Sequence, residues 1–185
     1  RDGCAEVIKY GMIGDAGLLD TLERADLRAD PEEVVARCIA HKRDLVEQDE
    51  FDTGARQLLN LGHTIGHGVE ACSGYQISHG KAVALMLPHV VKYTWRANPA
   101  KFAKVAEIMG VDTRDMTDVQ AAKAACEAMA EMCADVGLPR NLKDAGVDPS
   151  KFEQMAQDCI QGKPFFTNPC KGTVQDLINI YKSAY

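Results

Sequence analysis

The stretch RQLLNLGHTIGHGVEACSGYQISH, residues 56–79, contains the pattern that decides the fold. At 100° per residue on an α-helix, four of its polar side chains fall within a wedge of roughly 60°, and its apolar side chains cluster on the opposite side. The polar stripe holds a cation, an amide and two imidazoles: Arg56, Asn60, His63 and His67. This period predicts an amphipathic helix that buries one side and carries a chemically specific stripe on the other.

The same stretch carries glycines at positions 62, 66 and 68. Each disfavours a helix by up to about 1 kcal/mol, so we expect close packing or ligand access to require them. His79 follows after a loop, and three of the five histidines therefore lie within 17 residues. Imidazoles that converge from a helix and the next segment are typical of a transition-metal site. A single helical histidine is more often a solvated or core residue, so spacing alone leaves both interpretations open.

The length, net charge and cysteine content of the chain restrict the class of protein. The 185 residues suffice for one domain with a sizeable core, and the net charge of −6 argues against nucleic acid as a partner. No apolar run approaches the ~18 residues of a membrane span, and we recognise no signal peptide. Seven scattered cysteines form no CxxC pair, which indicates reduced, buried thiols in a cytoplasmic protein rather than disulfides or a zinc–thiolate site.

The chain shows helical periods throughout and no alternating apolar–polar runs, which predicts an all-α bundle of about nine to eleven helices in a single domain, residues 1–185. The most apolar helix, which contains Pro88, is expected to be buried at the centre. The first residue is Arg1 rather than Met, and we expect a preceding domain to be missing. Besides the histidine stretch, helices are predicted over residues 4–11, 15–25, 31–48, 81–95, 99–109, 117–136, 138–145, 148–160 and 174–185.

Two motifs carry a family resemblance: CAEVIKYG at residues 4–11, and LNLGHTIGHGVE at residues 59–70 with HG at 79–80. In both, the chain resembles the 3-dehydroquinate synthases, which belong with glycerol dehydrogenases and iron-containing alcohol dehydrogenases. The match runs in order over residues 1–93, about half of the chain. It implies the α-helical C-terminal domain of a homodimeric enzyme, in which this domain follows an NAD-binding α/β domain absent from this chain.

The resemblance also implies roles for individual residues. Glu6, His63 and His79 match the three ligands of a catalytic divalent metal, Zn²⁺ or Co²⁺. Lys9 matches a catalytic lysine at the substrate hydroxyls, and His67 matches a proton-transfer histidine. Three further positions match substrate-binding residues, the first two of which hold a carboxylate: Lys42, Arg56 and Asn60.

The implied reaction is that of a lyase in the shikimate pathway of aromatic amino acid biosynthesis. NAD oxidises one hydroxyl of 3-deoxy-D-arabino-heptulosonate 7-phosphate, so that phosphate can leave by elimination. The hydride then returns, the ring opens, and an aldol step closes 3-dehydroquinate. Asp52 weakly matches a residue that orients the proton-transfer histidine. Without a nucleotide domain, we expect no turnover by this chain alone.

The sequence departs from the family pattern at several positions, and these departures leave alternative functions open. Lys81 stands where the family commonly has Glu, and the tail lacks the Asp-Lys-Lys run that supplies a phosphate-binding lysine, for which Lys163 and Lys171 are weak substitutes. The second half looks more like iron-containing alcohol dehydrogenases. The leading alternative is therefore a metal-dependent alcohol or polyol dehydrogenase.

One position discriminates between these two enzymes. Iron-dependent alcohol dehydrogenases typically place His four residues after the first acidic ligand, whereas this chain has Tyr10 there. A related sugar-phosphate cyclase ranks lower, because its substrates lack the carboxylate that Lys42 and Arg56 would hold. A structural helical domain without catalysis is the alternative outside the enzymes.

Overall fold

The computed structural model describes residues 2–24, 31–51, 53–60, 62–161 and 170–185. These residues contain helices and no β-strand, so the predicted all-α class is confirmed. None of the helices is long and apolar enough to cross a membrane. The α-helices are α1 (Asp2–Ile13), α2 (Ala16–Arg24), α3 (Pro31–Gln48), α4 (His63–Cys72), α5 (His79–Thr94), α6 (Pro99–Ile108), α7 (Asp118–Asp135), α8 (Phe152–Gln161) and α9 (Val174–Ser183), and the 3₁₀ helices are η1 (Ala55–Asn60), η2 (Trp95–Ala97) and η3 (Pro149–Lys151).

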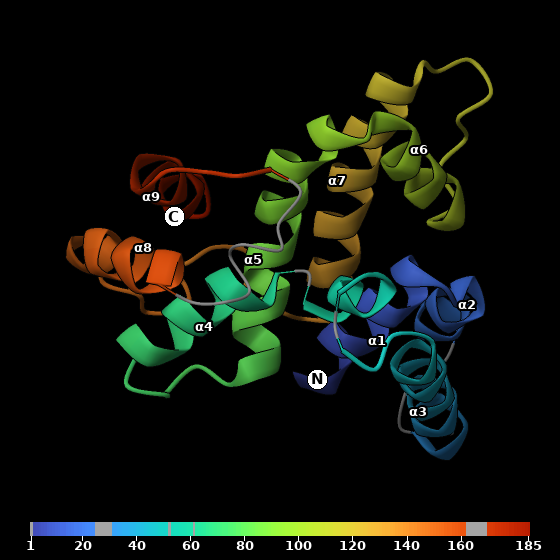
Figure 1. Cartoon of the computed structure of the whole chain (residues 1–185), viewed down its shortest axis with the longest axis horizontal. Coiled ribbons are helices and arrows are strands. Elements are labelled where there is room, and N and C mark those ends of the chain that lie inside the picture. The colour runs from blue at the N-terminus through green and yellow to red at the C-terminus, as the bar shows by residue number, and fades with distance from the viewer. Residues whose placement is uncertain (1, 25–30, 52, 61, 162–169) are drawn as a thin grey trace.

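Helix α5 is the central element, as its apolar sequence predicts. Helices α1, α4, α7 and α9 pack against it, and both of its sides are buried although Pro88 lies inside it. One side, with Ala84, Leu87 and Val91, belongs to a buried cluster with residues of α1, α2 and α7. The other, with Leu85 and Met86, packs against α4, α8 and α9. The two groups of helices accordingly lie on opposite sides of α5 (Figure 1).

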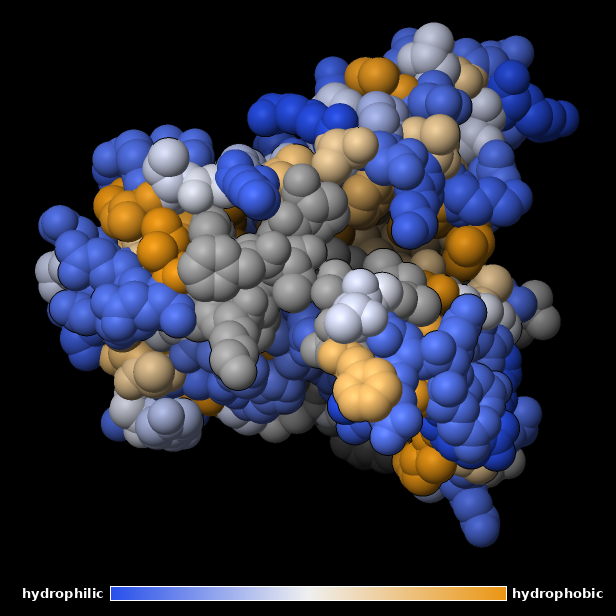
Figure 2. Space-filling model, viewed as in Figure 1, coloured by the Kyte–Doolittle hydropathy of each residue, from blue (hydrophilic) through white to orange (hydrophobic). Residues whose placement is uncertain are grey.

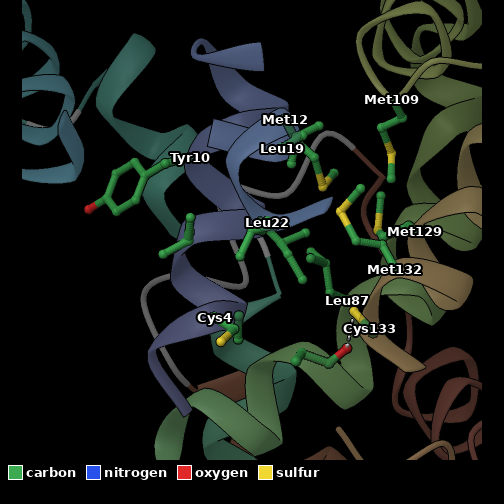
Figure 3. Close-up of a cluster of buried hydrophobic side chains, with 14 of the residues drawn as sticks. Cys4, Tyr10, Met12, Leu19, Leu22, Leu87, Met109, Met129, Met132 and Cys133 are labelled. Atoms are coloured by element: carbon green, nitrogen blue, oxygen red, sulfur yellow. Dashed lines mark hydrogen bonds between the residues drawn. The ribbon is translucent and has the colours of Figure 1, made fainter. Parts of the chain in front are cut away.

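The first of these cores is rich in sulfur-containing side chains. Figure 3 shows Met12 of α1 and Leu19 of α2 pointing toward Met129 and Met132 of α7. Leucine and methionine side chains pack tightly without polar partners, so this core joins α1 and α7 through apolar contacts. On the face drawn in Figure 2, hydrophilic residues cover most of α3 and α8.

Local signals mark several helix ends as predicted. Thr117 and Gln120 form a capping box at the start of α7, and Thr173 and Asp176 form one at the start of α9. In each, the threonine hydroxyl accepts the N–H of the third helical residue and the longer side chain accepts the N–H of the cap. Pro31 begins α3 at its first position, where the missing N–H costs no hydrogen bond.

Two predicted helices are wrong. Residues 56–72 do not form one helix: η1 ends at Asn60, and α4 begins at His63 after Gly62, whose φ of 80° is left-handed. Glycine adopts this conformation without steric penalty, so the chain turns there. Residues 138–145 form successive turns instead of a helix, because the Asn141 carboxamide oxygen accepts the backbone N–H of Asp144 at 2.7 Å.

Candidate metal centre

Three helices supply the side chains of the candidate site. Glu6 and Lys9 lie one turn apart on α1, His63 begins α4, and His79 begins α5. The two histidine-bearing helices approach closely because Gly66 of α4 has no side chain to separate them. Residues from both ends of the LNLGHTIGHGVE…HG pattern therefore converge on α1.

Glu6, His63 and His79 offer ligand atoms that lie within 4.8 Å of one another. Oε1 of Glu6 lies 3.4 Å from Nε2 of His63 and 3.8 Å from Nε2 of His79. Zinc bonds of 2.0–2.2 Å in tetrahedral geometry place ligand atoms about 3.3–3.6 Å apart. Oε1 of Glu6 is also buried with no hydrogen-bond partner among the described residues. A carboxylate oxygen in this state between two imidazole nitrogens fits a divalent cation.

Lys9 is part of this group and not of a surface ion pair. Its side chain is 2% exposed, and its ammonium donates to Oε2 of Glu6 and to the carbonyl of Leu59 at 3.0 Å. Nζ also lies 3.5 Å from Nε2 of His63. Burial lowers the pKa of Lys9 below its ordinary value, against the raising effect of Glu6, and the charge of Lys42 lowers it further.

Tyr10, at the position that discriminates between the two enzyme classes, lies beside this group, with the Lys9 ammonium 5.2 Å from the centroid of its ring. Its ring lies edge-on to the ring of His41 of α3, with centroids 5.8 Å apart. The next turn of α1 therefore presents the Lys9 ammonium to the histidines rather than a further metal-binding side chain.

Glu70 is a functional candidate that the sequence analysis left without a role. It lies on α4 and is 7% exposed. Its Oε2 lies 2.6 Å from Nδ1 of His67, and its Oε1 lies 2.8 Å from Nδ1 of His79. The signal was available in part, because Glu70 follows His67 by three residues and so lies on the same helical face.

The predicted substrate-binding residues lie on α3 and η1. Arg56 is partly buried, and its guanidinium donates to the carbonyl of Glu50 at 2.8 Å. Its backbone N–H donates to the Asp49 carboxylate, which also accepts the N–H groups of Thr53 and Gly54. These bonds, foremost that from Thr53, lower the pKa of Asp49. The loop before η1 is thereby tied to the end of α3.

Two other members of the predicted set differ in exposure. Lys42 is exposed on α3, and Asn60 is half-buried at the end of η1. Asp52 and Lys163 lie outside the described residues, and Lys171 is exposed. The substrate-binding role of Lys42, Arg56 and Asn60 therefore stays a prediction from the sequence. In contrast, the structure brings Glu6, Lys9 and the histidines into contact with one another.

A comparison with known families decides the relationship. Residues 3–136 match the family described as 3-dehydroquinate synthase C-terminal. The chain belongs to this family. Among individual members of that name, the 3-dehydroquinate synthase of Streptococcus mutans is 33% identical over 154 residues, which cover 80% of this chain and 38% of that enzyme.

This chain is also similar to dehydrogenases. The 1,3-propanediol dehydrogenase of Citrobacter freundii is 37% identical over 126 residues, covering 68% of this chain and 33% of that protein. A crystal structure of 1,3-propanediol oxidoreductase superimposes over 100% of this chain and 45% of its own, with a TM-score of 0.75 and 29% identity. The chain thus spans less than half the length of these relatives, and it shares its fold with 1,3-propanediol oxidoreductase.

Proposed function

We propose that this chain is the metal- and substrate-binding domain of a 3-dehydroquinate synthase. Its enzyme converts 3-deoxy-D-arabino-heptulosonate 7-phosphate to 3-dehydroquinate and phosphate in aromatic amino acid biosynthesis. The observation that carries this proposal is the buried Lys9 ammonium beside Glu6 and His63. A cation at this point suits a substrate with several oxygen atoms, because an ammonium group donates hydrogen bonds to hydroxyls.

The metal in this proposal is Zn²⁺ or Co²⁺, held by Glu6, His63 and His79. One carboxylate and two imidazoles form a ligand set that leaves coordination positions for substrate oxygens. When bound, the metal supplies Lewis acidity at the substrate oxygen that is oxidised, and NAD, held by a separate nucleotide-binding domain, supplies the hydride acceptor. The buried Oε1 of Glu6, which has no hydrogen-bond partner among the described residues, supports this assignment.

The remaining residues bind substrate and transfer protons. Arg56 offers a planar fork for the substrate carboxylate, and Lys42 adds a second cation. Asn60 contacts the substrate near its phosphate. His67 moves the proton, because its imidazole is the one of the three that is most exposed, at 55%. The homodimer, the single domain over residues 1–185 and the cytoplasmic location stay predictions.

A metal-dependent alcohol or polyol dehydrogenase is the second candidate. The superposition of the whole chain on 1,3-propanediol oxidoreductase favours it, because the tail is included in that match. Tyr10 argues against it, since its ring packs against His41 and the position holds no imidazole.

Phosphate release separates the two candidates. The full polypeptide that carries residues 1–185 is incubated with 3-deoxy-D-arabino-heptulosonate 7-phosphate, NAD and Zn²⁺. The synthase releases phosphate with no net NADH. No phosphate release, together with NADH formation from simple polyols, would establish the dehydrogenase instead.

A further inference from the structure

Each oxygen of the Glu70 carboxylate lies within hydrogen-bonding distance of a different histidine. Oε1 lies 2.8 Å from Nδ1 of His79, and Oε2 lies 2.6 Å from Nδ1 of His67. The rings of His67 and His79 stack on each other, with centroids 5.2 Å apart and planes 30° from parallel. We propose that Glu70 is a positioning residue that holds both imidazoles in one tautomer and orientation, and so couples a metal ligand to the proton-transfer group.

The tautomer follows from the chemistry of the contact. An ionised carboxylate only accepts hydrogen bonds, so Nδ1 of each ring must carry the proton. In a neutral imidazole the lone pair then lies on Nε2. For His79 this is the atom that faces Oε1 of Glu6 at 3.8 Å, in the candidate metal centre. A carboxylate behind a histidine ligand orients the ring and raises its basicity.

For His67 the same contact has a different consequence. With Nδ1 donating to Glu70, Nε2 of His67 is left as the basic nitrogen of a half-exposed ring. Glu70 therefore leaves the Nε2 lone pair of His67 available to accept a proton and that of His79 available to bind a metal.

His67, Glu70 and His79 also lie close enough to hold a metal by themselves. The distances favour positioning over direct binding. The two Glu70–histidine distances, 2.6 and 2.8 Å, are those of hydrogen bonds and are shorter than the ~3.3 Å between atoms that share a tetrahedral metal. Each oxygen of Glu70 already has a hydrogen-bond partner, whereas Oε1 of Glu6 has no hydrogen-bond partner among the described residues.

This inference rests on the proposed metal centre, and Co²⁺ binding tests both separately. The full polypeptide is prepared as wild type, Glu70→Gln, Glu70→Ala and the control Tyr181→Phe, and circular dichroism checks helix content. Tyr181 is a matched control because its buried hydroxyl donates to the Ile65 carbonyl of the same helix α4, and its other partner among the described residues is Cys159 and not a histidine. Co²⁺ affinity is measured against a competing chelator, and its visible spectrum reports the ligand geometry.

We expect Glu70→Ala to bind one Co²⁺ with an affinity about 10- to 100-fold lower and with an altered spectrum. Glu70→Gln should lie between Glu70→Ala and wild type, because the amide keeps one acceptor oxygen and loses the other. Tyr181→Phe should keep the wild-type affinity and spectrum. Wild-type affinity and spectrum in both Glu70 variants would overturn the positioning role alone. Loss of Co²⁺ from both Glu70 variants but not from His63→Ala would make Glu70 a metal ligand and would also overturn the positioning role. Absence of Co²⁺ binding by the wild-type protein would overturn the proposed metal centre itself.

Discussion

Gly66 of α4 lies directly against the backbone of Val83 of α5. A Cβ atom at Gly66 would lie 3.1 Å from Cα and 3.2 Å from the backbone nitrogen of Val83. Backbone atoms cannot move aside as a flexible side chain does, so a side chain here would push the two helices apart by a few tenths of an ångström. The same approach holds the rings of His63 and His79, at the starts of the two helices, with centroids 4.9 Å apart.

Replacing Gly66 with Ala should separate α4 from α5. We expect a loss of about 1–3 kcal/mol in the free energy of unfolding, because overpacking a tight contact strains both helices. Urea denaturation measures the change. Gly3→Ala is the matched control in a helix, since no atom of the described part of the chain lies within 4 Å of its Cβ position. That variant should be unchanged or up to about 1 kcal/mol more stable, and equal effects of the two substitutions would contradict the packing argument.

His63→Ala should remove stoichiometric metal and leave the helix content largely intact. The remaining Glu6 and His79 form an incomplete ligand set, and the imidazole of His63 is only partly buried, at 15% exposure. Metal analysis after dialysis and circular dichroism give the two readouts. An unchanged metal content would take His63 out of the ligand set.

Arg56→Ala should weaken binding of the carboxylate substrate by about 2–5 kcal/mol, as expected for the loss of one member of a desolvated charge pair. Steady-state kinetics of the full polypeptide measure this as a rise in KM. Arg43→Ala is the control, because Arg43 is an exposed arginine on α3 that pairs with Asp44. An Arg56 effect below about 0.5 kcal/mol would place the carboxylate elsewhere.

Cys126 and Cys133 should resist thiol reagents in the folded protein. Burial raises the pKa of Cys126 to about 11 and that of Cys133 to about 12. At pH 8 roughly one thiol in a thousand or fewer is then the reactive thiolate. Labelling followed by peptide mass analysis should find both residues unmodified in the native protein, while denaturation exposes all seven cysteines. Rapid native labelling of Cys133 would contradict its place in the core.

His89 should make stability depend on pH below neutrality. Burial, and secondarily the charge of Lys92, lower its pKa from 6.5, so the folded protein binds fewer protons than the unfolded chain between the two values. Stability is therefore present above pH 6.5 and is lost as pH falls toward the folded pKa. Urea midpoints at pH 7.5 and 5.5 should differ less in His89→Gln than in wild type. An identical pH dependence in the two proteins would exclude His89 as a contributor.

Short-range signals in the sequence account for most of the helices. The capping box of Thr117 and Gln120, and Pro31 at the start of α3, act between residues one turn apart, so local sequence suffices to place these ends. The apolar composition of α5 likewise predicts its burial, since both of its sides are apolar. The break at Gly62 was missed because its left-handed backbone interrupts a pattern that otherwise continues with the helical period.

Local sequence patterns were enough to predict the all-α class and most helix boundaries, and the motif resemblance added the family and a set of candidate residues. The burial of Lys9 beside Glu6 depends on how separate segments pack, because the contact of Lys9 with Leu59 joins residues 50 positions apart. Tertiary packing also adds His79 to Glu70 as a second histidine partner beside His67, since His79 reaches α4 only where Gly66 lets α5 approach. Periodicity describes one helix at a time, whereas these contacts depend on how separate helices pack.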